Sequence, residues 1–304
     1  MDSILVTGAT GFIGSQLVKD LTEVGYPVVA LARKTGNLEG LRSSGVEIRQ
    51  GDITDLRSVV AASRNTDVAI HMAAITSAGG ADYEKSFQAN IVGSQNLIDA
   101  CRTNGVKRIV YIGTQSDNTG AYATTKRGAE KLFIESGLDI TILRPSLVYG
   151  PGGKGMVHTM SEFVRKYPVI PMVGTGNYMM RPIYVGDVSQ AIMRSIERDP
   201  ARTAYNISGS VTLSFREFIE RVADVMGVRR TKVRVPYSLT FLGLAAVSAF
   251  WRSFPLTVDS LRGLVNPRVH DSDDAAEDLD FRPIDLDEGL RKTFAGTSGS
   301  CVPL

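Results

Sequence analysis

A tyrosine and a lysine four positions apart are the residues of this 304-residue chain best suited to acid–base chemistry. Tyr122 and Lys126 lie in the sequence Tyr-Ala-Thr-Thr-Lys, and on a helix two side chains at this spacing share one face. A free tyrosine titrates near ~10, so its phenol is a poor acid or base at neutral pH unless a nearby cation stabilises the phenolate. The pair therefore fits a phenol that takes a proton from a hydroxyl, or returns it. Because such a pair is common by chance, its position in the fold carries the hypothesis.

Three glycines mark a second chemical feature, near the N-terminus. The segment Thr7-Gly8-Ala9-Thr10-Gly11-Phe12-Ile13-Gly14 follows a strand expected at 4–7 and opens an amphipathic helix expected at 12–24. Small residues here allow a tight turn, close approach of a pyrophosphate to the backbone, and helix–strand packing. The helix N-terminus adds unpaired amides and a partial positive charge. The segment predicts a dinucleotide site, the alternative being a purely structural glycine turn.

The end of the second expected strand bears on which dinucleotide binds. An NAD enzyme usually has an acidic residue there, which accepts a hydrogen bond from the ribose 2′-hydroxyl. This chain has Leu31-Ala32-Arg33-Lys34 instead, with no acid before Glu39. Arg33 and Lys34 suit a 2′-phosphate, so NADP is favoured over NAD. In the alternative interpretation, both are solvated loop charges that tolerate NAD.

Short apolar runs alternate with helical patterns through the first half of the chain. The expected strands span residues 4–7, 27–31, 46–48, 68–71, 109–112 and 140–143, and the expected helices span residues 12–24, 56–62, 83–102 and 122–135. Such alternation with continuous apolar strands is typical of a parallel sheet covered on both faces. The sequence therefore predicts an α/β fold with a doubly wound parallel sheet.

The second half is interrupted by prolines and predicts a smaller lobe. Asp187 is expected to N-cap a helix over 188–197, Ser214 and Glu217 to form a capping box, and residues 203–208 to form one more strand. The expected organisation is a dinucleotide-binding region at 1–150, a substrate lobe at 151–295 from which 187–210 returns to the sheet, and a flexible tail at 296–304.

Composition excludes several classes of protein. Lys and Arg number 34 against 32 Asp and Glu, a balance that argues against a nucleic-acid partner. Two distant cysteines, Cys101 and Cys301, and only three histidines disfavour disulfides and a metal site and favour a reducing, cytoplasmic location. The longest apolar run, 239–251, falls short of the ~20 residues of a membrane span, and the first residues do not resemble a signal peptide.

The glycine segment and the Tyr-x-x-x-Lys pair, in this order of elements, resemble the extended branch of the short-chain dehydrogenase/reductase superfamily, the NAD-dependent epimerase/dehydratase family. The resemblance implies a Rossmann sheet, a homodimer formed through residues 83–102 and 122–135, and hydride transfer at a secondary alcohol or ketone. It also implies that Thr114, at the end of the fifth strand, forms a hydrogen bond with the substrate oxygen. Tyr122 then acts as acid or base, and Lys126 forms a hydrogen bond with the nicotinamide ribose.

The same resemblance supplies most of the expected cofactor contacts. The full set is Gly8, Thr10, Gly11, Phe12, Ile13, Gly14, Arg33, Lys34, Asp52, Ile53, Ala73, Ala74, Asn90, Tyr122, Lys126, Pro145, Ser146 and Val148. Asp52 either accepts from the adenine amino group or N-caps the helix from Thr54 onward. His71 is a base by type, but its place at an apolar strand end favours a packed role.

Substrate inference from the resemblance is weaker. Only seven residues separate Thr114 from Tyr122, fewer than in many nucleotide-sugar enzymes, so Gln115 or Ser116 is expected to supply polar contacts. Arg181 and Arg268 are candidate phosphate contacts, although Pro182 departs from the family pattern.

Three functions remain open at this stage. A nucleotide sugar is the favoured small-molecule substrate, and a sterol-like or other apolar hydroxy compound, which the run 239–251 would line or merely pack beside, is the alternative. A non-catalytic NAD(P)-binding sensor or assembly subunit is the third possibility. A serine hydrolase is disfavoured because no Gly-x-Ser-x-Gly elbow occurs in the sequence.

Overall fold

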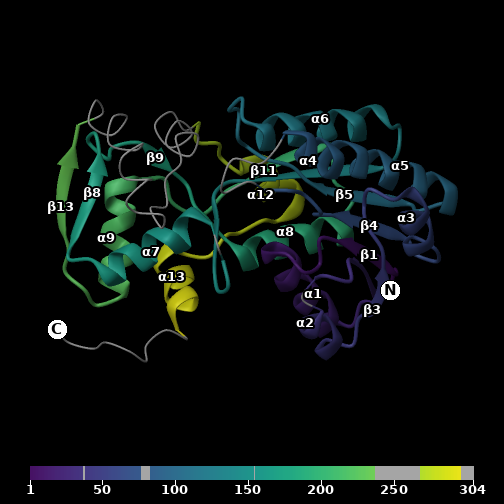
Figure 1. Ribbon diagram of the computed structural model, residues 1–304, viewed down its shortest axis with the longest axis horizontal. Coiled ribbons are helices and arrows are strands. Elements are labelled where there is room, and N and C mark those ends of the chain that lie inside the picture. Colours follow the sequence, from purple (N-terminus) through teal and green to yellow (C-terminus); the bar gives the residue numbers. More distant parts are fainter. Residues whose placement is uncertain (37, 77–82, 154, 237–267, 296–304) are drawn as a thin grey trace. The chain divides into compact units, whose positions relative to one another are not determined.

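The computed structural model describes residues 1–36, 38–76, 83–153, 155–236 and 268–295 (Figure 1). The chain divides into two compact units. The sheet unit comprises residues 1–146, 185–207 and 271–282, and the second unit comprises 147–184, 208–270 and 283–304. The apolar run 239–251 and the tail 296–304 lie outside the described residues.

Seven parallel strands form the sheet unit's centre, in the order β11-β6-β5-β4-β1-β2-β3. They are β1 (Ile4–Thr7), β2 (Val28–Ala32), β3 (Glu47–Gln50), β4 (Val68–His71), β5 (Arg108–Ile112), β6 (Ile140–Pro145) and β11 (Ala204–Ile207). The doubly wound parallel sheet expected from the sequence is confirmed. The strand order reverses between β1 and β4, and ligands of such sheets bind at the carboxyl ends of the strands beside this point.

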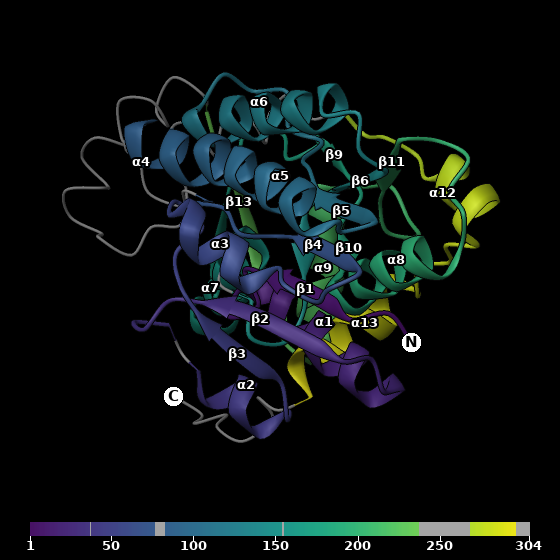
Figure 2. The same ribbon diagram turned by 90° about the vertical axis from the view of Figure 1, so that its right-hand side faces the viewer.

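Helices cover both faces of this sheet (Figure 2). One face carries α3 (Leu56–Ala62), α5 (Gly93–Asn104) and α6 (Ala121–Glu135), and the other carries α1 (Phe12–Val24) and α8 (Val185–Glu197). Burial explains the arrangement, since Leu17 and Leu21 of α1 and Leu97 and Phe133 of α5 and α6 are fully buried. Apolar stripes on both sets of helices therefore pack against strands that are apolar on both faces.

Two helical expectations need correction. Residues 83–102, expected as one helix, form α4 (Tyr83–Phe87), a π-helical turn η1 (Gln88–Val92) and the first part of α5. Asp187 is not the N-cap of α8, because that helix begins at Val185, which is itself buried. Asp187 instead lies buried in the first turn.

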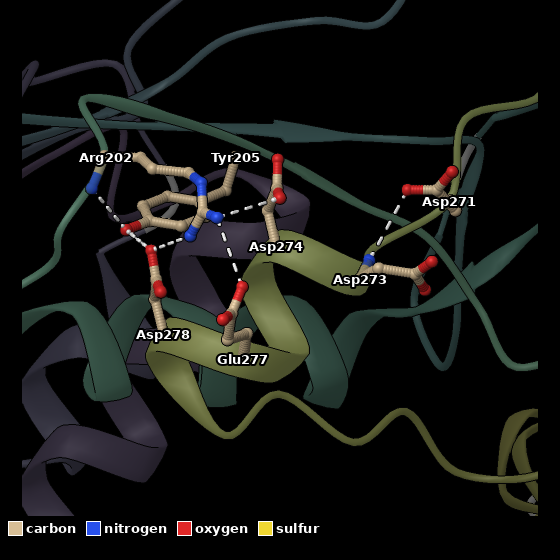
Figure 3. Close-up of polar contacts among 7 residues, drawn as sticks. All are labelled: Arg202, Tyr205, Asp271, Asp273, Asp274, Glu277 and Asp278. Carbon is tan, nitrogen blue, oxygen red and sulfur yellow. Dashed lines mark hydrogen bonds and ion pairs between the residues drawn. The ribbon is translucent and has the colours of Figure 1, made fainter.

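A short helix from late in the chain belongs to the sheet unit. Figure 3 shows α12 (Asp273–Leu279) beside β11, where the Arg202 guanidinium pairs with three acidic side chains of α12. Asp278 is one of them, and its carboxylate also accepts a hydrogen bond from the Tyr205 hydroxyl at 2.8 Å. This polar cluster, with buried Leu279, holds α12 on the edge of the sheet.

The second unit is built from short strand pairs and three helices among its described residues. Its strands are β7 (Val148–Tyr149), β8 (Val169–Val173), β9 (Met179–Met180), β10 (Ile183–Tyr184), β12 (Leu213–Ser214) and β13 (Thr231–Val235), and its helices are α7 (Met156–Lys166), α9 (Phe215–Val225) and α13 (Leu286–Phe294). The capping box expected at Ser214 and Glu217 is confirmed. The core of this unit includes one fully buried residue from each helix: Val164, Phe218 and Leu290.

No described helix has the length and apolar character needed to cross a membrane.

Candidate active site

Tyr122 and Lys126 lie one turn apart at the start of α6, whose N-cap is Gly120. Ala123 and Ala129 of the same helix are fully buried, so α6 lies close to the sheet. Lys126 is only 4% exposed, whereas Tyr122 is half-buried. The helix therefore places the Lys126 side chain in the interior, while Tyr122 keeps part of its surface exposed.

Thr114 lies just beyond β5, and its side chain is close enough to Tyr122 to favour the phenolate. Burial raises the pKa of Tyr122 above its usual value, and the Thr114 side chain opposes that rise. The sequence argument expects a cation to lower this pKa, but in the chain alone the loss of hydration has the larger effect. Tyr122 is therefore a protonated phenol at neutral pH and can act as an acid.

Lys126 is held by the end of β5. Its Nζ donates to the backbone carbonyl of Ile112 and lies 4.2 Å from the centre of the Tyr111 ring. The Tyr111 hydroxyl in turn donates to the backbone carbonyl of Lys126 at 3.0 Å. Burial lowers the pKa of Lys126 to about 7, and the Glu130 carboxylate opposes this change. The amine therefore changes charge near neutral pH.

An arginine beside Lys126 ties down the short loop between Thr114 and Tyr122. The Arg127 guanidinium donates to the carbonyl oxygens of Ser116 at 2.7 Å and Asn118 at 2.9 Å. The Ser116 amide donates to Thr114 Oγ1 at 3.1 Å. The loop that carries Ser116 is thus fixed at both ends to groups of the acid–base site.

Gln115, expected to contact substrate, joins two strand ends in the structure. Its amide donates to the carbonyl oxygens of Arg144 at 2.9 Å and Ile207 at 3.3 Å. Ser146 donates its backbone N–H to the same Ile207 carbonyl at 2.9 Å, directly after Pro145 ends β6. Gln115, Pro145 and Ser146 therefore lie together where β6 and β11 end.

The glycine turn between β1 and α1 is tightly packed. Gly8 has φ +75°, and a Cβ there would lie 2.7 Å from the Ala73 nitrogen. A Cβ at Gly14 would overlap the Gly8 carbonyl oxygen, while the Gly11 N–H donates to that oxygen at 2.9 Å.

Thr10 lies inside this turn, and Phe12 and Ile13 begin α1. This helix has no side-chain cap and no acid in its first turn. These features leave the helix N-terminus suited to an anion.

Arg33 and Lys34 directly follow β2 and are exposed. After β3, Asp52 Oδ1 accepts from the Thr54 amide at 3.0 Å and closes a turn. The N-cap of α3 is Asp55, whose side chain accepts from the backbone of the helix, so the capping role considered for Asp52 is wrong. Ile53 follows in that turn, and its carbonyl accepts from a side chain of α5 at 2.9 Å.

The segment after β4 runs against the glycine turn. The Ala73 amide donates to Thr7 Oγ1 at 3.3 Å, and Ala74 follows. Asn90, on the π-helical turn, accepts from the Ile75 amide through Oδ1 at 2.8 Å. His71 is 1% exposed at the end of β4, which matches the packed role expected from the sequence.

Val148, Arg181 and Arg268 belong to the second unit. Val148 lies in β7, and Arg268 is exposed. Arg181 follows β9 and donates through Nε to the Gly209 carbonyl at 2.6 Å. The other expected residues belong to the sheet unit, where they lie at the end of a strand, in the segment that follows one, or in the helices α1, η1 and α6.

Three polar features of the site were not predicted from the sequence. They are the Arg127 contacts, the Arg144–Glu130 ion pair between β6 and α6, and a buried network around His71. Their partners lie between 9 and 64 positions apart, too far for local spacing to indicate them. The one available signal was a histidine among apolar residues, directly before the small-residue segment.

The fold and the glycine turn define a Rossmann-type enzyme of the dinucleotide-binding class. Residues 4–208 match the NAD dependent epimerase/dehydratase family. The chain belongs to this family, and its relatives are epimerases, dehydrogenases and reductases.

Relatives with different printed activities align with this chain. A 2-alkyl-3-oxoalkanoate reductase of Stenotrophomonas maltophilia (strain K279a) is 28% identical over 97% of this chain and 99% of its own length. A 3 beta-hydroxysteroid dehydrogenase/Delta 5→4-isomerase of Mycobacterium tuberculosis (strain ATCC 25618 / H37Rv) is 30% identical over 76% of this chain and 71% of its own length.

Solved structures share the fold. The UDP-glucose 4-epimerase of Thermotoga maritima, solved with UDP-glucose, superimposes with a TM-score of 0.79 at 24% identity, covering 96% of this chain and 97% of the epimerase. At this level of identity the likeness establishes the fold.

Proposed function

We propose that this enzyme moves a hydride between NAD(P) and a secondary alcohol or ketone of an apolar substrate. One observation carries the proposal: Tyr122 lies one turn from a buried Lys126 at the start of α6, and Thr114 follows the carboxyl end of β5 close to the phenol. Sequence alone ranks a nucleotide sugar first. The reductase relative, which aligns over 97% of this chain, favours an oxo compound instead, and so does the short loop that carries Ser116.

The glycine turn fits the pyrophosphate of such a cofactor. Gly8 and Gly14 leave no room for a side chain, and α1 begins without a cap or an acid that would compete for its amides. Exposed Arg33 and Lys34 favour the 2′-phosphate of NADP. When bound, the nicotinamide supplies or accepts the hydride.

The side chains of the site handle the proton. Thr114 and Tyr122 hold the substrate oxygen, and the Tyr122 phenol donates its proton to this oxygen as it becomes an alkoxide. Lys126 hydrogen-bonds to the cofactor ribose and, when it is protonated, adds a positive charge one helical turn from Tyr122. The phenol gives this proton up in reduction, and the phenolate takes it back in oxidation.

A nucleotide sugar is the second candidate substrate. Fold neighbours that bind UDP-sugars favour it, together with the two arginines of the second unit, Arg181 and Arg268. In this case the hydride returns to the same sugar, and no net change in the cofactor is measured.

Turnover assays test these alternatives. The enzyme is incubated with NADPH and 2-alkyl-3-oxo acids or 3-oxosteroids, and separately with NAD and UDP-glucose. We expect oxidation of NADPH with an oxo substrate, and loss of that turnover in Tyr122→Phe but not in Tyr83→Phe, an exposed tyrosine on α4. Cofactor binding without turnover of any substrate class would favour a sensor or assembly subunit and contradict the proposal.

We also propose a cytoplasmic homodimer that pairs through α4, α5 and α6. Tyr83 and Ile134 are large apolar side chains on these helices, 54% and 53% exposed. Light scattering of the purified protein should give twice the chain mass, and Ile134→Glu should give a monomer. A wild-type monomer would contradict this proposal.

A further inference from the structure

Five buried polar side chains link the glycine turn to the catalytic helix. Each is at most 2% exposed: Thr7, His71, Asn90, Ser94 and Thr125. They come from β1, β4, η1, α5 and α6. Buried polar groups are costly unless each is hydrogen-bonded, so a connected set of this kind fixes the relative positions of its elements.

The hydrogen bonds around His71 have a defined direction. Ser94 Oγ lies 2.6 Å from the backbone carbonyl oxygen of Asn90 and must donate its single proton there. Ser94 Oγ is therefore the acceptor for His71 Nε2 at 3.0 Å, so this ring nitrogen carries a proton.

The other side of the imidazole gives a consistent result. Thr7 Oγ1 accepts from the Ala73 amide and lies 2.7 Å from His71 Nδ1. The Thr7 hydroxyl then donates to Nδ1, which must be unprotonated. The surroundings agree, because the ring lies against Tyr111 and Phe133, with centroids at 5.8 and 5.6 Å. Burial and the nearby charge of Lys126 lower the pKa of His71 to about 3, so the ring is neutral.

The network continues from Asn90 into α6. Asn90 Nδ2 donates to Thr125 Oγ1 at 2.9 Å, and Thr125 Oγ1 donates to the Ala121 carbonyl at 2.7 Å. Thr125 lies between Tyr122 and Lys126 in the sequence. Asn90 also holds the Ile75 amide, so one side chain connects the segment after β4 with the first turn of α6.

We propose that one directed hydrogen-bond relay positions Tyr122 and Lys126 relative to the glycine turn between β1 and α1. Its members are Thr7, His71, Ser94, Asn90 and Thr125, and His71 is the neutral tautomer with its proton on Nε2. His71 is a positioning residue that exchanges no proton with substrate. A small displacement of a reacting group is costly to the rate, so the relay acts on turnover more than on binding. This catalytic role rests on the proposed function, whereas the relay itself does not.

A spectroscopic experiment tests the relay without any substrate. The ¹⁵N shifts of the imidazole nitrogens are recorded for the full chain from pH 5 to 8, and His71→Gln identifies the signals of His71. We expect a neutral ring with its proton on Nε2 throughout this range. A doubly protonated ring, or a proton on Nδ1, would overturn the proposal.

Variants test the positioning role. Thr7→Val removes the hydroxyl at nearly constant shape, and Thr7→Ser restores it. We expect kcat to fall by about tenfold or more in Thr7→Val and to recover to within about threefold in Thr7→Ser, with substrate KM nearly unchanged. Thr66→Val is the matched control. Thr66 is also a buried threonine, but it lies just before β4, and its hydroxyl donates to the Ser63 backbone carbonyl at 2.9 Å. An equal loss of kcat in this control would contradict the positioning role.

The two experiments separate the two hypotheses. If the Nε2–H tautomer is found but no oxo compound or sugar is turned over, the proposed function fails and the relay stands. If turnover is found and Thr7→Val behaves like wild type, the proposed function stands and the positioning role fails.

Discussion

Replacing Lys126 by methionine tests whether the site really holds a desolvated amine. The usual pKa of a lysine is 10.5, and burial lowers that of Lys126 to about 7 in the folded chain. Between these two values the unfolded chain binds more protons than the folded chain, so the free energy of unfolding rises with pH. The penalty for burying the charge is fully present below pH 7 and disappears as the pH approaches 10.5.

The size of this effect follows from the shift. Each pKa unit corresponds to about 1.4 kcal/mol, and with the folded amine half protonated at pH 7 the gain from pH 7 to 9 is about 2 kcal/mol. Urea unfolding of the cofactor-free protein, followed by circular dichroism at pH 7, 8 and 9, measures it. We expect Lys126→Met to lack this gain and to be more stable than wild type at pH 7.

A surface lysine of the same helix is the control. Lys131 is 75% exposed beside Glu135, and Lys131→Met should keep the wild-type pH dependence. If the difference between wild type and Lys126→Met stays constant from pH 7 to 9, the amine is hydrated and the reasoning about its burial is wrong.

Four further substitutions probe separate parts of the site. Tyr122→Phe should lower turnover by about 10²-fold or more while the nucleotide Kd, measured by calorimetry, changes only a few-fold; undiminished turnover would reject the acid–base role. Arg33→Asp should reverse the NADP-to-NAD ratio of kcat/KM, and an unchanged ratio would show that the guanidinium does not meet a 2′-phosphate. Gly14→Ala, whose methyl would overlap the Gly8 carbonyl oxygen, should cost about 2 kcal/mol or more in urea unfolding and abolish nucleotide binding, whereas a wild-type protein would mean that the turn relaxes. Arg127→Lys, which cannot hold two carbonyls at once, should raise substrate KM several-fold with little change in kcat, and a constant KM would separate the loop from the substrate.

The sequence determined the features that depend on local spacing. Strand and helix periodicity indicated the parallel sheet, and the glycine triplet indicated the turn that opens α1. The four-residue spacing of Tyr122 and Lys126 placed them one turn apart on the same face of a helix. Each of these depends on backbone geometry within a few residues, which the order of residue types specifies directly.

Tertiary structure alone decided the electrostatics and the polar partners. The direction in which the pKa of Tyr122 shifts depends on burial by elements distant in sequence, and Thr7 contacts His71 only because β1 and β4 are adjacent in the sheet. Asp52 and Asp55 are both good capping residues by type, and the path of the chain selected Asp55. Desolvation and directional hydrogen bonds depend on what surrounds a group in space, and residue spacing along the chain does not contain that information.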